Sequence, residues 1–266
     1  MRIYTLGTSH GDSTFNRFNS STLYETSDGV CYLVDAGAPV EALIRRKGLL
    51  IQNVRAAFIT HMHDDHAGGL SGLIKQVTKY KKLRETPFTL LLPEETAIKA
   101  LQAWVLALHE NALDEAVEYN AVTDGTVYDD ENLTVTAIRT AHLRTQGRTE
   151  GDPCSFAYVL FFKKENVTVL HTGDLWADFS DFPKIAFEKD FDCCILEATH
   201  YNPVTSLPLL KDARFKKLIF NHVFDKWHTR IYPGGVADNG EKELLSLTKE
   251  LPYPVYIAHD GDEFIF

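Results

Sequence analysis

The amino-acid sequence predicts an α/β (α+β) protein in which helices cover the outer faces of mixed β-sheets. Strand-like segments dominate the start and the middle of the chain, and helical segments are interspersed among them. No repeat of solenoid period and no Pro-, Gly- or Ser-rich linker divides the 266 residues. Because this length is near the upper limit for one hydrophobic core, we expect a single domain over residues 1–266.

Hydrophobic periodicity and turn residues place the elements. Ser27-Asp28-Gly29, between two apolar segments, predicts a hairpin turn, and Pro93 suits the first turn of a helix. The predicted strands are 1–6, 22–26, 30–34, 54–60, 87–92, 132–141, 154–163, 166–172, 191–197, 216–221, 253–258 and 262–266. The predicted helices are 39–47, 65–77, 93–110, 206–214 and 239–250.

Composition and charge limit the class of function. No apolar run approaches the length that crosses a bilayer, and the N-terminus lacks signal-peptide features. The four cysteines show no CxxC spacing, so we expect reduced thiols and a cytoplasmic protein. The net charge of -10 argues against a basic surface for DNA or RNA. We therefore expect a small anionic substrate, no long nucleic acid and no membrane as partners, with a homodimer as a possible assembly.

The chemistry begins in the run His61-Met62-His63-Asp64-Asp65-His66, which offers three imidazoles and two carboxylates after an apolar strand. His61 and His63, two residues apart, can point the same way from an extended loop and share one metal ion. Asp65 and His66 enter the following helix and can reach a second ion. Imidazole and carboxylate ligands suit zinc, the first choice here, and also manganese or iron.

Further candidate ligands follow the apolar strands predicted elsewhere in the chain. They are His142, Asp174, His222 and His259. Side chains at the ends of several strands can meet at one edge of a sheet core, so we expect the site at such an edge. His259 could equally contact substrate or orient a ligand, and we count it as a substrate-binding residue.

The run HxHxDH, the later His142, the Thr172-Gly173-Asp174 turn and the late His222 resemble the metallo-β-lactamase-fold superfamily of metal-dependent hydrolases. The resemblance spans nearly the whole chain, from Gly7-Thr8 through Asp35-Ala36-Gly37 to Ala258-His259-Asp260-Gly261. Within the superfamily the chain looks most like the branch of ribonuclease Z and small phosphodiesterases. The residues that carry this likeness are Leu6-Gly7-Thr8, Glu197-Ala198-Thr199-His200 and Leu218-Ile219-Phe220-Asn221-His222.

This resemblance implies a four-layer αββα sandwich with two divalent metal ions at one edge of its two sheets. It implies that one ion is held by His61, His63 and His142, that the other is held by Asp65, His66 and His222, and that Asp174 bridges them. The chain departs from ribonuclease Z between His142 and Asp174, where only 31 residues leave no room for the family's long tRNA-binding arm. We therefore expect a substrate other than tRNA.

The leading hypothesis is a phosphodiesterase that cleaves a small, cyclic nucleotide-like diester through a metal-bridging hydroxide. Two divalent ions, two carboxylates and a hydroxide give the centre a charge of about +1, which favours developing negative charge on a phosphate. The predicted catalytic residues are Asp65, Asp174 and His228, the last as the acid that protonates the leaving alcohol. The predicted substrate-binding residues are His259, Arg144, Arg148, Lys226 and Arg230.

Two alternatives remain at this level. The same fold carries thioester and lactone hydrolases related to glyoxalase II, and fold alone does not separate these from phosphodiesterases. A redox metalloprotein is the alternative of another class. Its diiron branch typically replaces the second ligand pair with an acidic one, whereas His63 and His66 are both present here.

Overall fold

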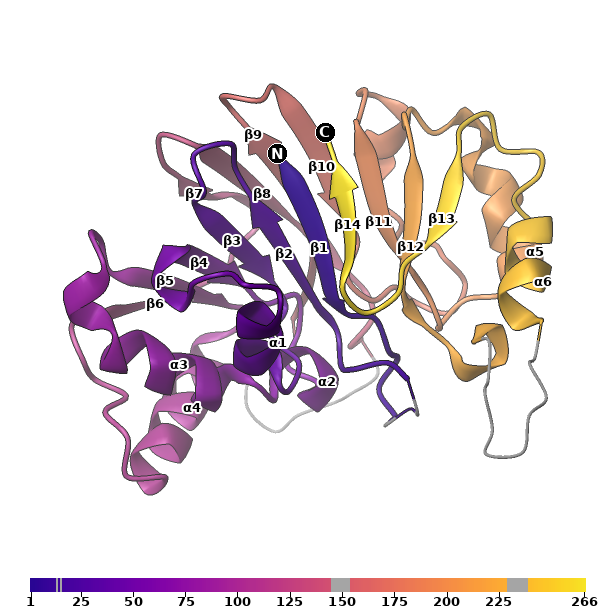
Figure 1. The fold of residues 1–266 in the computed structure, drawn as a ribbon. Helices are drawn as coiled ribbons and strands as arrows, with labels where there is room; N and C mark the ends of the chain where they lie inside the picture. Colours follow the sequence, from indigo (N-terminus) through magenta and orange to yellow (C-terminus); the bar gives the residue numbers. More distant parts are fainter. Residues whose placement is uncertain (13, 15, 145–153, 229–238) are drawn as a thin grey trace.

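The computed structural model describes residues 1–12, 14, 16–144, 154–228 and 239–266. Strands of these residues form two seven-stranded mixed sheets (Figure 1). The first sheet runs in the order β14 (Asp262–Ile265), β1 (Arg2–Gly7), β2 (Ser21–Glu25), β3 (Cys31–Val34), β4 (Val54–Phe58), β5 (Phe88–Leu92) and β6 (Val117–Ala121). The second runs in the order β13 (Val255–Ile257), β12 (Leu218–Val223), β11 (Cys193–Ala198), β10 (Val167–His171), β9 (Ser155–Phe162), β8 (Leu133–Thr140) and β7 (Gly125–Asp129).

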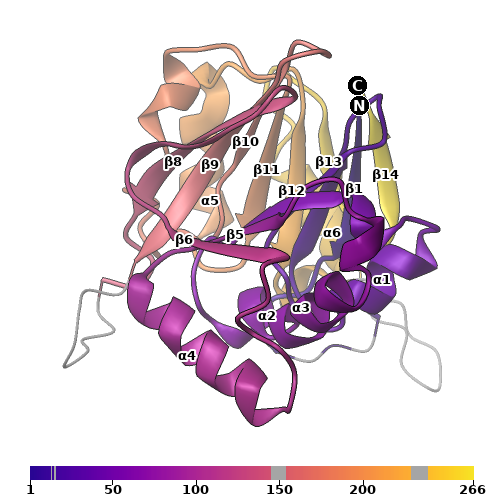
Figure 2. The same cartoon turned by 90° about the vertical axis from the view of Figure 1, so that its left-hand side faces the viewer.

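Three clusters of buried residues define the layers. One lies between the two sheets and contains residues such as Phe58, Phe156 and Tyr158. Another joins the outer face of the first sheet to the helices α1 (Val40–Arg46), α3 (Leu70–Lys79) and α4 (Glu95–Ala107). The third joins the second sheet to α6 (Gly240–Ser246) and to the 3-10 helix Leu207–Asp212, which follows α5 (Pro203–Ser206). Figures 1 and 2 show these helices outside the sheets, so the predicted αββα sandwich is confirmed.

Local sequence explains why the strands take these positions. In β8, Leu133, Val135 and Ala137 alternate with less buried residues and face the core between the sheets. The β2–β3 hairpin pairs Leu23 with Leu33, as its turn predicts, and Gly29 supplies the φ of +79° that this turn requires.

The structure differs from the sequence prediction in three places. β6 and β7 were not predicted, because nearly all their residues are exposed or half-exposed and lack a continuous apolar pattern. The helix expected at 65–77 is two helices, α2 (Asp64–Ala67) and α3, which Gly68 and Gly69 separate. The helix expected at 206–214 is wrong: α5 ends at Ser206 and a 3-10 helix over Leu207–Asp212 follows. Pro208 has no N–H with which to extend α5 beyond Ser206.

Several segments that follow strands meet at one edge of the sandwich. The loop after β4 leads into α2, which lies at the lower edge between the sheets in Figure 1. The ends of β8, β10 and β12 carry the residues that approach this loop from the second sheet. Within the described ranges, no helix is long and apolar enough to span a membrane.

Candidate metal centre

The seven side chains predicted as metal ligands converge at the edge between the two sheets. His61, His63, His142 and Asp174 each offer a ligand atom within 4.8 Å of the others, and so do Asp65, His66 and His222. These are the two sets that the family resemblance implies. The donor set, five imidazoles and two carboxylates, is one that divalent metal ions prefer.

One carboxylate oxygen lies between the two sets. The Oδ2 atom of Asp174 is 3.5 Å from His61 Nε2 and 3.7 Å from His142 Nε2. It is also 3.4 Å from His66 Nε2 and 3.7 Å from His222 Nε2. Ligands about 2.0–2.1 Å from a tetrahedral zinc ion are about 3.3 Å from one another. The observed spacing therefore suits an oxygen shared by both sets.

Hydrogen bonds fix the ring tautomers on the first-sheet side of the centre. His66 Nδ1 is 2.8 Å from the Asp35 carboxylate, which can only accept, so Nδ1 carries the proton. Thr60 donates its hydroxyl to Asp35, and His61 Nδ1, 3.1 Å away, therefore donates to Thr60 Oγ1. In neutral rings both Nε2 atoms then present lone pairs, and these face Asp174.

The rings from the second sheet follow the same rule. His142 Nδ1 donates to the backbone carbonyl of Leu175 at 3.3 Å. The Thr199 hydroxyl donates to the carbonyl of His222 and accepts from the Nδ1 of the same residue at 3.1 Å. The Nε2 of His222 is left 2.9 Å from an Asp65 oxygen. Several lone pairs that point at carboxylate oxygens repel one another unless a cation lies between them.

Unsatisfied polar atoms provide a second test of metal binding. His66 Nε2 and Asp174 Oδ1 are buried and have no hydrogen-bond partner among the described residues. Leaving a buried polar atom unpaired costs about 1–3 kcal/mol, and charged groups cost more. The residues therefore fit divalent metal ions, which would satisfy both atoms.

The backbone at this edge adopts conformations that few residues tolerate. Gly173 has a φ of +58°, and a Cβ there would lie 2.9 Å from Phe156 O, so the Thr-Gly-Asp turn requires glycine. Asp35 and His222 have φ values of +61° and +48°, and such strain costs of order 1–3 kcal/mol each. The surrounding packing therefore holds these two side chains in place at an energetic cost, as is common at functional sites.

Charge and burial set the protonation of the centre. Burial lowers the pKa of His61 well below its usual value. Burial also opposes the charged form of His66, but the attraction of the Asp174 and Asp35 carboxylates is larger, so the pKa of His66 is raised. Burial raises the pKa of Asp174, but His222 and His66 outweigh it and hold the carboxyl ionised. His66 would therefore release a proton when a cation binds.

The structure also places Glu197 and His200, which were not among the predicted site residues, beside the centre. His200 Nδ1 is 2.9 Å from Glu197 Oε2 and 3.7 Å from Asp174 Oδ2. Its ring stacks on His222, and it is partly open to solvent, with 31% of the side chain exposed. Burial alone would lower the pKa of His200, but the carboxylates of Glu197 and Asp174 have the larger effect and raise this pKa to about 9. The three-residue spacing of Glu197 and His200 was the available sequence signal.

The predicted substrate-binding residues lie in different surroundings. Arg144 follows His142 by two residues, and its guanidinium stacks 3.7 Å from the centre of the Trp176 ring. Lys226 lies 4.4 Å over the Trp227 ring and near Glu243. His259 is half-exposed and is 2.8 Å from Glu241 rather than in either ligand set. Arg148 and Arg230 lie outside the described residues.

His228, predicted as the general acid, is grouped by the structure with His10 and Asp225 and not with the seven ligands. Its side chain is buried, and its Nε2 donates to the carbonyl of Val223 at 2.5 Å.

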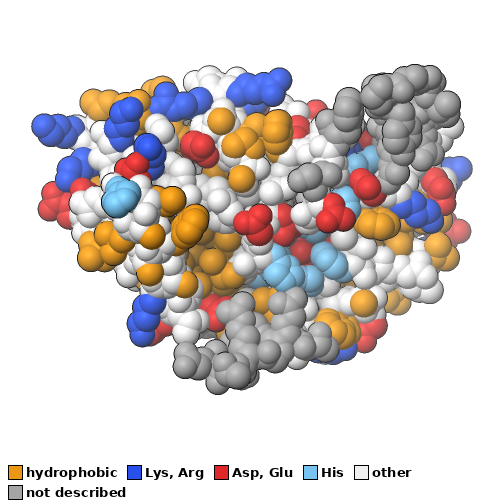
Figure 3. Space-filling view, turned by 90° about the horizontal axis from the view of Figure 1, so that it is seen from below, with side chains coloured by type: hydrophobic (Ala, Val, Ile, Leu, Met, Phe, Trp, Pro, Cys, Tyr) orange, Lys and Arg blue, Asp and Glu red, His pale blue; other side chains and the backbone are white. Residues whose placement is uncertain are grey.

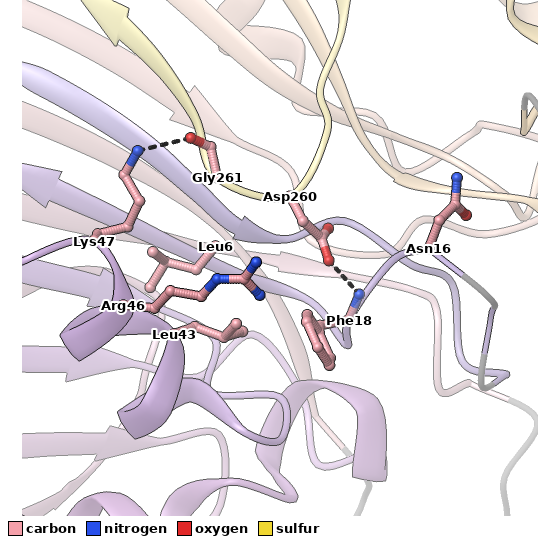
Figure 4. Close-up of a pocket in the computed structure, with 8 residues that line it drawn as sticks. All are labelled: Leu6, Asn16, Phe18, Leu43, Arg46, Lys47, Asp260 and Gly261. Atoms are coloured by element: carbon pink, nitrogen blue, oxygen red, sulfur yellow. Dashed lines mark hydrogen bonds between the residues drawn. The ribbon is translucent and has the colours of Figure 1, made fainter.

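Figure 3 shows histidine and acidic side chains gathered on the lower face of the molecule, between areas of undescribed residues. A separate cavity of about 360 Å³ lies between α1 and the loop after β1 (Figure 4). Lys47 there donates to the carbonyl of Gly261, and Asp260 accepts from the backbone N–H of Phe18. These contacts join three chain segments.

Comparison with known proteins finds relatives named ribonuclease Z and solved structures of similar fold. Ribonuclease Z of Pseudomonas putida is 34% identical over 146 residues, which cover 53% of this chain and 44% of that protein. The match therefore spans under half the length of this curated relative. Two solved structures, YhfI of Bacillus subtilis and the short form of human tRNase Z, both have a TM-score of 0.73. Their identities are 20% and 19%, with coverage of 99% and 100% of this chain and 98% and 99% of theirs, which shows the fold.

These relatives overturn the expectation that no long nucleic acid is a partner. The curated relatives are named as ribonucleases and the human structure as a tRNase. The expectation rested on a net charge of -10, which averages over the whole surface. A few local cations near a metal centre are enough to hold a phosphate backbone, so the overall charge does not exclude RNA.

The comparisons bear out the superfamily that the sequence motifs suggested, including its ribonuclease Z-like branch. A more specific match comes from a family model described as anti-Pycsar protein Apyc1, which covers residues 1–231. That range includes both ligand sets, Asp174 and the Glu197–His200 pair. With the sandwich fold and the convergent ligands in place, the chain belongs to the anti-Pycsar Apyc1 family of the metallo-β-lactamase fold.

Proposed function

We propose that this chain is a metal-dependent hydrolase of phosphodiester bonds that holds two divalent ions, Zn²⁺ first, and acts on a small anionic diester of cyclic-nucleotide type. The observation that carries the proposal is the position of Asp174 Oδ2 between two sets of imidazoles, with the Nε2 atoms of His61, His66 and His222 at 3.5, 3.4 and 3.7 Å. The chain also has relatives named ribonuclease Z, which supports a phosphodiester as the bond that is cleaved. We also propose that residues 1–266 act as one domain in the cytoplasm. The core shared by both sheets supports the single domain, and the free cysteines, three of them buried, support the compartment.

Bound divalent ions would stabilise negative charge on the attacked phosphate and lower the pKa of a bound water. The chain supplies the remaining functions. Asp35, Thr60 and Thr199 hold the ligand rings in one tautomer and orientation. Asp65 and Asp174 provide the negative charge that the ions require.

His200 is better placed than His228 to donate a proton to the leaving oxygen. Its ring lies against His142 and His222, at centroid distances of 4.6 and 5.5 Å, and Glu197 holds its Nδ1. The partly exposed ring leaves Nε2 for substrate. Arg144, at the rim, supplies a cation whose donors can bind a second phosphate oxygen.

The test is a substrate panel assayed with metal-loaded wild type and the Asp174→Ala variant. The panel contains a cyclic nucleotide, a bis-aryl phosphate, a mono-aryl phosphate, a thioester, a lactone and a short RNA. We expect wild type to cleave the two small diesters fastest and Asp174→Ala to lose most of that activity with its fold intact. Preferential cleavage of the thioester or lactone would refute the phosphodiesterase, and faster cleavage of RNA would refute the small substrate.

A further inference from the structure

Two loops far apart in sequence meet beside the seven-residue centre. The backbone N–H of Val223 donates to the carbonyl of Thr8 at 2.9 Å, and Ser9 pairs with Val223 in an isolated parallel bridge. The loop after β1 therefore lies along the segment that follows β12. This contact places the ring of His10 edge-on to Phe224, 5.1 Å between centroids, and to His228, 5.8 Å away.

The hydrogen bond of His228 determines its tautomer. Its Nε2 is 2.5 Å from the carbonyl oxygen of Val223, which can only accept, so Nε2 carries the proton. In a neutral ring Nδ1 then has a lone pair, and this atom lies 3.3 Å from Asp225 Oδ1. Burial and the nearby Arg17 lower the pKa of His228 to about 4, so the ring is neutral near pH 7. Two acceptors thus face each other, an arrangement that a cation between them would stabilise.

His10 is a buried residue beside the same place and has an unsatisfied ring nitrogen. Its side chain is 6% exposed, and its Nδ1 has no hydrogen-bond partner in the described part of the chain. The nearest carboxylate to its Nε2 is Asp12, 3.8 Å away and almost fully exposed. Burial lowers the pKa of His10, which leaves its ring a neutral donor of electron pairs.

Ligand atoms of His10, Asp225 and His228 all lie within 4.8 Å of one another. If each ligand atom moved by less than about 1 Å, all three could lie 2.0–2.2 Å from one shared zinc ion. We propose that these three residues form a further metal-ion site, which binds one divalent cation of the zinc type. Two imidazoles and one carboxylate are a donor set shared by zinc, iron and cobalt, and water would complete the coordination.

The position of the site suggests what the ion would do. Gly11 follows His10, and a Cβ at Gly11 would lie 3.6 Å from Asp65 Oδ2. The loop after β1 thus lies against a predicted ligand of the seven-residue centre. An ion bound by His10, Asp225 and His228 would hold the loop after β1 against the segment after β12. It would thereby keep Gly11 of this loop in its position next to Asp65.

The test counts metal per chain in the full-length protein equilibrated with buffered Zn²⁺. Wild type is compared with His10→Gln and Asp225→Asn, and with Asp12→Asn as the matched control on the same loop. Asp225 is partly exposed at its surface, 41% of the side chain, and asparagine keeps its shape, so this variant decides the outcome even if His10→Gln fails to fold. Melting temperatures recorded with and without Zn²⁺ provide the second readout.

We expect Asp225→Asn and His10→Gln to bind one zinc equivalent fewer than wild type, while Asp12→Asn binds as many as wild type. The zinc-dependent rise in melting temperature should shrink in the same two variants. Equal zinc content in wild type and Asp225→Asn would overturn the site, as would an equal loss in Asp12→Asn. The measured quantity is the difference in zinc per chain between each variant and wild type. It therefore does not depend on how many ions the seven-residue centre binds.

Discussion

Asp35 shows how a residue without direct contact to substrate can control the centre. Its carboxylate accepts from His66 Nδ1 and from the backbone N–H of Thr60, both at 2.8 Å. In Asp35→Asn the amide can present a donor to His66 and reverse its tautomer. We expect a loss of about 10- to 100-fold in metal affinity or turnover, the usual effect of losing a partner that orients a ligand.

Metal content, turnover and melting temperature would be measured on the same preparation of this variant. Asparagine tolerates a positive φ, so the backbone at residue 35, with its φ of +61°, should keep its conformation. An unchanged metal affinity together with unchanged turnover would show that Asp35 does not orient His66.

Arg144 tests whether substrate is selected by charge. The guanidinium stacks on Trp176 and is 3.9 Å from Asp178, with 48% of the side chain exposed. Because solvent screens an exposed charge, we expect Arg144→Gln to raise the KM for an anionic diester by a few-fold to about tenfold. A neutral ester should be cleaved as before. Lys226→Gln, assayed in parallel, tests the other described cation; equal effects on both esters would mark these residues as ordinary loop charges.

At the scale of elements, the turn between β7 and β8 ties the two sheets together through one carboxylate. Asp130 Oδ2 accepts from the hydroxyls of Tyr32 in β3 and Tyr128 in β7, at 2.6 and 2.9 Å. Its Oδ1 accepts from the backbone N–H groups of Asn132 and Leu133, both at 2.8 Å. We expect Asp130→Ala to lower the free energy of unfolding by about 2–3 kcal/mol, because it leaves these donors unpaired.

The same carboxylate predicts a dependence on pH. Burial raises the pKa of Asp130, but its hydrogen bonds, first that from Tyr32, outweigh this and lower it. The stabilisation is therefore complete above the unfolded-state pKa of about 4 and is lost as the pH falls through the lower folded-state value. Denaturant unfolding at several pH values should show the gap between wild type and Asp130→Ala closing below about pH 4. Glu118→Gln, a change at an exposed carboxylate of β6, is the control. A gap independent of pH would refute the assignment.

At the scale of the whole molecule, the candidate centre joins the two sheets. Four of the ligands, His61, His63, Asp65 and His66, follow β4 of the first sheet. On the second sheet, His142 follows β8, Asp174 follows β10 and His222 lies in β12. Ions that bind only this folded arrangement should stabilise it, by about 2.7 kcal/mol for each ion at 100 times its Kd. For a chain of this size we expect chelation to lower the melting temperature by about 5–10 °C per ion.

Calorimetry of chelated and zinc-restored protein would measure this shift. Asp174→Ala, which lacks the shared oxygen, should show a much smaller difference between the two states. A melting temperature that does not respond to chelation in wild type would argue against metal binding across the two sheets.

Much of the arrangement was predictable because it depends on local patterns. Apolar alternation in β8 and the turn at Gly29 specify strands through short-range sterics and burial. The 3-10 helix after α5 and the half-exposed β6 and β7 escaped prediction, since they depend on neighbours that the periodicity of one segment does not show.

The sequence by itself determined the class of mixed sheets covered by helices and the candidate ligands, because strand periodicity, ligand types at strand ends and the HxHxDH run are local features of the chain. The αββα sandwich and the division of the ligands into two sets followed from the resemblance of these motifs to the metallo-β-lactamase-fold superfamily. Only the tertiary structure decided which histidines lie beside the centre. Glu197 turns His200 toward Asp174, while the carbonyl of Val223 holds His228 in a separate group with His10. These outcomes rest on tertiary contacts, and the sequence around a loop histidine does not show which residue it will contact in the folded protein.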